Sequence, residues 1–218
     1  MAGGDLSERV SVRARFERFP MTVKGAFILR GEDSDPHQVE LRGGAVVGIG
    51  TSTRVAMPLA PASLDVVPHR DVFVPFEVPL SELDPGWYTL EAELEVDGTA
   101  GAFDGGRRFS VPWPRATVWR GQVKVDREVE VGSSRVRVEQ LDCGGDSVKA
   151  HLRVEPPGPI SVRMTADGDR IEVLEVEQDE TSGRAKVTTY PVLRTHERVT
   201  LEIHHGKATA SVEIPLPR

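Results

Sequence analysis

The 218-residue chain contains a single cysteine, Cys143, and aromatic residues make up only 6% of its composition. One cysteine excludes an intrachain disulfide and any metal site built from several thiolates. It is consistent with a reducing compartment, so we expect a cytoplasmic protein. We expect the thiol itself to be exposed and without a catalytic role, because no neighbouring base can be assigned to it.

An excess of basic charge is also lacking, because 27 Lys and Arg residues stand against 34 Asp and Glu, giving a net charge of −7. Without a basic field to attract phosphates, nucleic acid and anionic membranes are not expected partners. The first 25 residues hold no unbroken apolar run of the kind found in signal peptides. No segment approaches the roughly 18 to 20 apolar residues that span a bilayer, so we expect no membrane span.

Helical periodicity is absent as well, since no long window places apolar residues at i, i+3, i+4 and i+7. Alternation with a period of two is present instead, most clearly from Tyr88 to Val96, where polar residues stand between the apolar ones. This pattern is typical of a strand with one face on a core and the other in water. Similar alternation recurs after residue 148, so the sequence predicts an all-β protein.

Turn signals divide the first half into about seven strands, a count typical of an immunoglobulin-like sandwich. Three prolines between Pro58 and Arg70 predict an extended crossover loop in that segment. Turns are predicted at Gly31–Pro36, Gly43-Gly44 and Asp97–Gly106. The expected strands cover residues 9–17, 22–30, 38–42, 45–49, 72–78, 87–96 and 107–111.

The run Val111-Pro112-Trp113-Pro114 marks a domain boundary, because two prolines cannot continue a strand ladder but make a short stiff connector. We therefore predict two tandem immunoglobulin-like antiparallel β-sandwiches. The N-terminal sandwich spans 1–111, the connector 112–116 and the C-terminal sandwich 117–218. Trp113 and Trp119 are expected to pack at the junction.

The run from Leu83 to Tyr88, Leu-Asp-Pro-Gly-Trp-Tyr, resembles the tyrosine corner of immunoglobulin-like and fibronectin-type sandwiches. In that family the tyrosine hydroxyl bonds back to nearby backbone. The position two residues after the tyrosine is a cysteine in antibody domains. It is Leu90 here, so the resemblance implies no disulfide between the sheets.

Two kinds of binding residue stand out. Asp33, Asp35 and His37 share one loop, and function tends to sit on loops carried by rigid sandwiches. Calcium favours such oxygen-rich loops, but the carboxylate that completes an EF-hand-type pattern is missing, so the alternatives are a partner contact and a solvated loop.

Trp87 is out of phase with Tyr88 and faces away from the predicted core, so it needs a loop, the other domain or a partner to cover it. Trp87, Trp113 and Trp119 could together include a sugar-stacking platform.

Other patterns give no catalytic or metal site. The glycines between Gly43 and Gly50 lack the helix that a dinucleotide-binding loop requires. His204 and His205, the best zinc candidates together with His196 and His151, are adjacent on a strand and so point to opposite faces. We therefore predict no metal, no cofactor and no catalytic residue.

Two further runs, Arg18 to Val39 and Arg107 to Pro114, are similar to accessory β-sandwich regions of actinobacterial enzymes that build cell-wall glycopolymers, notably teichoic-acid-type transferases. The resemblance implies an accessory module whose catalytic part lies elsewhere. We predict a non-catalytic binding or assembly module, accessory to bacterial polysaccharide synthesis, that binds a protein partner or a glycan. The alternatives are a general protein-interaction scaffold, which could form a homo-oligomer through an exposed strand edge, and a small metal-dependent hydrolase using the histidine and acid cluster.

Overall fold

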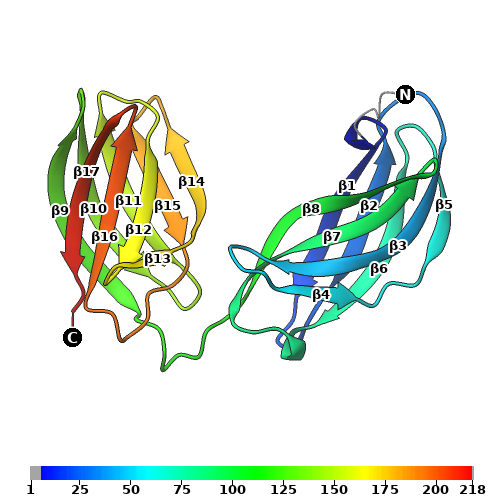
Figure 1. The fold of residues 1–218 in the computed structure, drawn as a ribbon, viewed down its shortest axis with the longest axis horizontal. Helices are drawn as coiled ribbons and strands as arrows, with labels where there is room; N and C mark the ends of the chain where they lie inside the picture. Colours follow the sequence, from blue (N-terminus) through cyan, green and yellow to red (C-terminus); the bar gives the residue numbers. More distant parts are fainter. Residues whose placement is uncertain (1–5, 218) are drawn as a thin grey trace. The chain divides into compact units, whose positions relative to one another are not determined.

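The computed structural model describes residues 6–217, which fold into antiparallel β-sheets without any α-helix (Figure 1). No helix among these residues is long and apolar enough to cross a membrane. The chain divides into two compact units between Val111 and Pro112. Each unit has its own cluster of buried apolar side chains, and each is a sandwich of two sheets.

The first unit has two sheets in the order β1-β2-β6 and β4-β3-β7-β8, and β5 also pairs with β3. When β4 and β5 are taken together as one edge element, these orders match the A-B-E and C-F-G strands of an immunoglobulin-like sandwich. The elements are η1 (Leu6–Glu8), β1 (Val10–Arg18), β2 (Thr22–Gly31), β3 (His37–Gly48), β4 (Arg54–Met57), β5 (Ala62–Val66), β6 (Asp71–Pro79), η2 (Leu80–Glu82), β7 (Gly86–Val96) and β8 (Thr99–Val111).

The second unit pairs a sheet of order β14-β15-β11-β10-β9 with one of order β13-β12-β16-β17. From β10 onward these orders match the A-B-E-D and C-F-G strands of an immunoglobulin constant domain, with β9 and β13 as added edge strands. The strands are β9 (Gly121–Val131), β10 (Ser134–Cys143), β11 (Val148–Glu155), β12 (Ser161–Ala166), β13 (Asp169–Ile171), β14 (Val173–Asp179), β15 (Arg184–Thr189), β16 (Arg198–His205) and β17 (Ala208–Pro215).

The tyrosine corner is present at the start of β7. Tyr88 is 3% exposed, and its hydroxyl donates a hydrogen bond of 2.8 Å to the carbonyl of Asp84. Its ring stacks on Phe109 at a centroid distance of 5.7 Å. A Cβ added to Gly86 would lie 3.3 Å from the Tyr88 ring, so the small residue before the corner allows the ring to pack closely. The predicted corner is therefore confirmed, and its hydrogen bond joins the two ends of the tight connection into β7.

Three predictions about strands in the first unit are wrong. The two strands predicted at 38–42 and 45–49 are one strand, β3, whose register shifts between Leu41 and Gly43. Gly43-Gly44 is thus part of a bulged strand and not a turn. The predicted crossover loop contains β5, which pairs with the first half of β3. Prolines flank β5 without breaking it, because an edge strand needs hydrogen bonds on one side only.

The turn predicted over Asp97–Gly106 is much shorter than expected. Asp97 and Gly98 alone connect β7 and β8, with φ values of 48° and 80°. Two residues with positive φ make the type I′ turn that matches the twist of a hairpin, and Asp-Gly is its favoured sequence. The following residues therefore extend β8 from Thr99.

Candidate functional site

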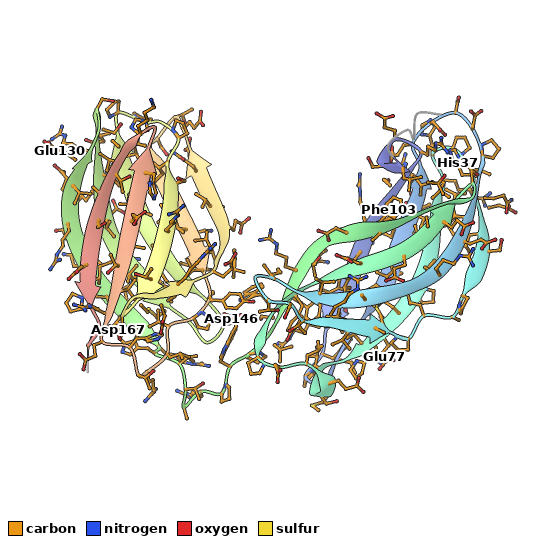
Figure 2. All side chains as sticks on the ribbon, viewed as in Figure 1. His37, Glu77, Phe103, Glu130, Asp146 and Asp167 are labelled. Carbon is orange, nitrogen blue, oxygen red and sulfur yellow. The ribbon has the colours of Figure 1, made fainter. Side chains whose placement is uncertain are left out.

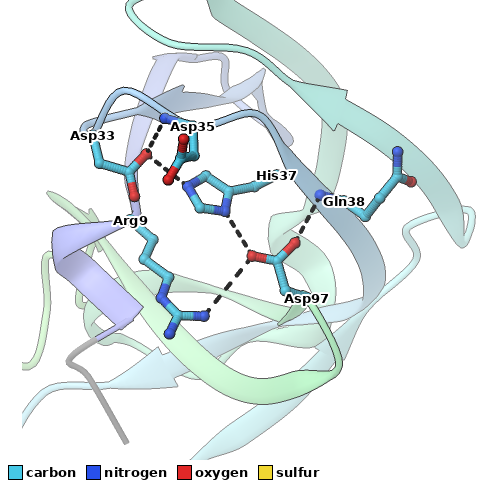
Figure 3. A network of polar contacts seen from close by, with 6 residues as sticks. All are labelled: Arg9, Asp33, Asp35, His37, Gln38 and Asp97. Atoms are coloured by element: carbon cyan, nitrogen blue, oxygen red, sulfur yellow. Dashed lines mark hydrogen bonds and ion pairs between the residues drawn. The ribbon is translucent and has the colours of Figure 1, made fainter.

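The predicted binding loop holds a network of polar contacts centred on His37, the first residue of β3 (Figure 3). Figure 2 shows His37 at one end of the first sandwich. Its ring is 6% exposed, with Nε2 2.8 Å from Oδ1 of Asp33 and Nδ1 2.6 Å from Oδ2 of Asp97. Asp97 also accepts the backbone amide of Gln38 at 3.0 Å and lies 3.8 Å from Nη1 of Arg9.

The imidazole of His37 is held in its protonated form. Ionised carboxylates only accept hydrogen bonds, so both ring nitrogens must donate, which requires a proton on each. Burial lowers the pKa of His37, but the bonds to Asp97 and Asp33 raise it further, so the pKa lies above the usual 6.5. The bond from His37 is also the main cause of the lowered pKa values of Asp33 and Asp97.

This arrangement leaves the loop little capacity for ligands. His37 has no free nitrogen for a metal, and one oxygen of Asp33 accepts both the imidazolium and the backbone amide of Asp35 at 3.1 Å. Of the three predicted binding residues, Asp33 and His37 thus form an intramolecular ion pair, and Asp35 is exposed beside it. The sequence prediction missed Asp97, although its Asp-Gly turn was a signal that a carboxylate would sit at a sandwich end.

Replacing His37 by Gln is expected to destabilise the first unit in a pH-dependent way. Because the folded pKa of His37 is raised, its contribution is complete below about pH 6.5 and is lost as pH rises through the folded pKa. The partners Asp33 and Asp97 have lowered pKa values, so their contribution is complete above 3.8 and is lost at lower pH. We expect the unfolding free energy of wild type to exceed that of His37→Gln by about 1 kcal/mol at pH 5, since both carboxylate partners are partly exposed to solvent.

The measurement is chemical denaturation of wild type and His37→Gln at steps between pH 4 and pH 9. His196→Gln serves as the control, because His196 belongs to the second unit and its Nδ1 accepts a hydrogen bond from the backbone amide of Leu193, not from a carboxylate. If the difference in unfolding free energy between wild type and His37→Gln grew between pH 6.5 and pH 9, the assignment of a protonated His37 would be wrong.

The three predicted tryptophans are all half-buried. Trp87 alternates with Tyr88 on β7 and stands on the side away from the core, as its position in the sequence predicts. Trp113 packs edge-on against Tyr190 at 5.4 Å. Trp119 packs on the second core and donates its indole N–H to the carbonyl of Pro217 at 3.0 Å. Both of these rings thus have contacts within the second unit itself.

The remaining polar candidates do not form a centre. Among residues 6–217, no three His, Cys, Asp or Glu side chains are placed to hold a metal ion. His204 lies 2.9 Å from the hydroxyl of Thr209, and His151 lies 2.8 Å from Asp142, so these histidines have separate partners. The expectation of an exposed Cys143 is wrong: the thiol is 7% exposed at the end of β10, and burial raises its pKa to about 12.

The structure reveals one surface that the sequence did not predict, the solvent side of the β1-β2-β6 sheet, here called the outer face. Its two central cross-strand rows are Arg13-Ile28-Phe73 and Arg15-Ala26-Pro75. Phe73 is 61% exposed and stands beside the half-buried Ile28. Met21 and Phe19, which are 63% and 43% exposed, lie in the β1–β2 turn beyond the charged row at that end of the face. An exposed aromatic ring among other apolar side chains marks a candidate interaction surface.

The sequence signal for this surface was weak because β6 carries a nearly continuous apolar run, Val72-Phe73-Val74-Pro75-Phe76. Such a run reads as a strand buried on both sides. In the structure Val74 and Phe76 are buried in the core, and Val72 is half-buried and packs against it. Phe73 and Pro75 therefore face solvent.

Comparison with known proteins identifies no family. No protein-family model matches the chain, and no curated protein sequence matches it. A solved structure titled as a conserved domain protein from Bacillus anthracis is similar at 12% identity and a TM-score of 0.39, covering 95% of this chain and 87% of its own. A marsupial T cell receptor is similar at 12% identity and a TM-score of 0.28, covering 94% of this chain and 62% of its own.

The class of protein is nevertheless defined by the fold itself. The chain is an all-β protein of two sandwiches with immunoglobulin-like strand orders.

Proposed function

We propose that this protein is a non-catalytic interaction module that binds another protein through the outer face. The observation that carries the proposal is Phe73, an aromatic ring 61% exposed in the middle of a regular strand. Aromatic side chains dominate the energetics of protein interfaces, and an exposed one amid other apolar residues is a natural anchor. Ile28 and Ala26, half-buried on the neighbouring strand, extend the apolar area around it.

Pairing through the edge of β6 is less well supported than binding through this face. β6 is an edge strand of its sheet, and it contains Pro75 and ends at Pro79. Proline at an edge lacks the N–H that an added strand would use, and it blocks edge-to-edge association. Binding through the outer face uses side chains and not backbone N–H groups, so the prolines do not hinder it.

A glycan is the second candidate ligand, in keeping with the resemblance to accessory regions of glycopolymer transferases. The half-buried Trp87 favours it, because a ring on the outer side of β7 could stack on a sugar. Trp113 and Trp119 support it less, since their rings already contact Tyr190 and Pro217. We therefore place the protein partner first.

Replacing Phe73 by Asp is expected to abolish partner binding without unfolding the protein. The probe is a displayed library of random twelve-residue peptides selected on the immobilised full chain. Peptides that bind wild type should lose at least about tenfold in affinity for Phe73→Asp, because a charge replaces the apolar anchor. Thermal unfolding should show both variant and wild type folded, since the side chain is largely in water.

The matched control is Val176→Asp, which places the same charge at an exposed apolar position, 39% exposed, on β14 of the second unit. Its binding should equal that of wild type. Selected peptides that bind Phe73→Asp as tightly as wild type would overturn the proposed function.

A further inference from the structure

We infer that the partner on the outer face is an extended acidic segment of another protein, carrying two carboxylates at alternate positions beside an apolar residue. This inference rests on the proposed function and names the chemistry of its partner. It is carried by the charges of the outer face, by the spacing of those charges and by the size of the sheet.

Acidic and basic side chains occur together at the two ends of the face, whereas its two middle rows carry basic side chains only. At the ends, Arg30 lies 3.8 Å from Asp71, and Lys24 lies 3.0 Å from Glu77 and stands opposite Glu17. The two middle rows contain Arg13 and Arg15 and no carboxylate. Neither arginine has an ion-pair partner among the residues that the structure describes.

Arg13 and Arg15 thus stand beside the apolar side chains of the middle rows without a carboxylate in those rows. Guanidinium groups bind carboxylates in a bidentate manner, and those bonds are stronger where apolar groups displace water. A partner that covers Phe73 and Ile28 therefore gains most when it brings carboxylates to Arg13 and Arg15.

The spacing of the arginines favours an extended segment. Arg13 and Arg15 are two residues apart on β1, so their side chains leave the same side of the strand about 6.7 Å apart. An extended peptide repeats its same-side residues with the same period. Carboxylates at positions i and i+2 of a segment running along β1 would thus meet the two arginines in register. An apolar side chain on the same side of the segment, two positions beyond the carboxylate that meets Arg13, would reach toward Ile28 and Phe73.

The size of the sheet favours a segment over a folded partner or a second copy. Three strands about 4.8 Å apart and nine residues long present roughly 14 Å by 30 Å. This is about 400 Å² in projection, about half of the roughly 800 Å² per partner found in standard interfaces between folded proteins. A peptide of about nine extended residues matches the 30 Å length. Two copies of a chain with net charge −7 also repel each other.

The test uses the peptides selected on the full chain, resynthesised with a fluorophore and titrated by anisotropy. We expect the selected sequences to carry Asp or Glu at positions i and i+2 and an apolar residue two positions beyond one of them. Affinity should fall at least tenfold for Arg13→Gln/Arg15→Gln, and by a similar factor when each acidic residue of the peptide is replaced by its amide. Binding should also weaken by about tenfold between 0.05 M and 0.5 M NaCl, because the charges lie at the surface.

The matched control is Arg163→Gln/Arg170→Gln, which removes two arginines that are 76% and 81% exposed from β12 and β13 of the second unit. This variant should bind like wild type. Peptides that require Phe73 but contain no acidic residues, or that ignore Arg13→Gln/Arg15→Gln, would overturn the inference and leave the proposed function standing.

A second copy as occupant would give a different result. Sedimentation equilibrium of the full chain without peptide would then show a dimer that strengthens with concentration and disappears in Phe73→Asp. That outcome overturns the acidic segment as partner. A monomer at every concentration, together with acid-dependent peptide binding, supports it.

Discussion

Replacing Phe27 by Ala is expected to lower the unfolding free energy of the first unit by about 4 kcal/mol. The side chain is 0% exposed at the centre of β2, and its ring lies 5.0 Å from that of Phe76 across the pair β2·β6. Truncation removes most of the apolar area of the ring from the core and leaves a cavity that the surrounding strands cannot fill. It also removes the aromatic contact, which contributes beyond its buried area.

The two units have separate apolar cores, so we expect the loss to appear in one of two calorimetric transitions. Phe73→Ala is the control, because it removes the same ring from the exposed side of the neighbouring strand β6 and should change stability by less than about 0.5 kcal/mol. Equal losses in Phe27→Ala and Phe73→Ala would show that the packing of the first core has been misassigned.

Replacing Gly183 by Ala is expected to destabilise the second unit by about 3 kcal/mol. Gly183 ends the turn between β14 and β15 with a φ of 67°, a left-handed conformation that costs a residue with a Cβ about 1 kcal/mol. An added Cβ would also lie 2.2 Å from the carbonyl oxygen of Val154. The backbone cannot retreat easily, because the carbonyl of Gly183 accepts the amide of Val154 at 2.7 Å.

Gly168→Ala separates the two causes of this loss. Gly168 has a φ of 97°, but an added Cβ would meet no atom within 4 Å. It should therefore show the cost of backbone strain alone, about 1 kcal/mol. If denaturant titrations show that Gly183→Ala lowers the unfolding free energy no more than Gly168→Ala does, β11 must move aside without an energetic cost.

The fold was predictable where the signal was local. The corner at Tyr88 was found because its motif occupies six consecutive residues and its hydrogen bond spans only four. β5 was missed because its strand character comes from β3, about 25 residues earlier in the chain, and not from its own proline-flanked sequence. Pairing across such distances overrides local propensity, which a single sequence does not reveal.

The candidate sites were less predictable for the same reason. His37 was singled out, but its partner Asp97 is 60 residues away, so an internal ion network looked like a ligand-binding loop. Cys143 was misjudged because the glycines after it suggested an open turn. It in fact continues the alternation of Val136, Val138 and Leu141 on the core side of β10, across the bulge between Val138 and Gln140. Phe73 was missed because the parity of a continuous apolar run depends on which side of the strand meets the core.

The buried thiol of Cys143 can serve as a chemical probe of local opening in the second unit. A thiol that is 7% exposed and has a pKa of about 12 reacts with a disulfide reagent only when the surrounding structure opens. Because it is the one cysteine in the sequence, every labelling event reports on β10 and the sandwich around it. The labelling rate of the native protein therefore measures how often the second unit opens. It does not depend on opening of the first unit.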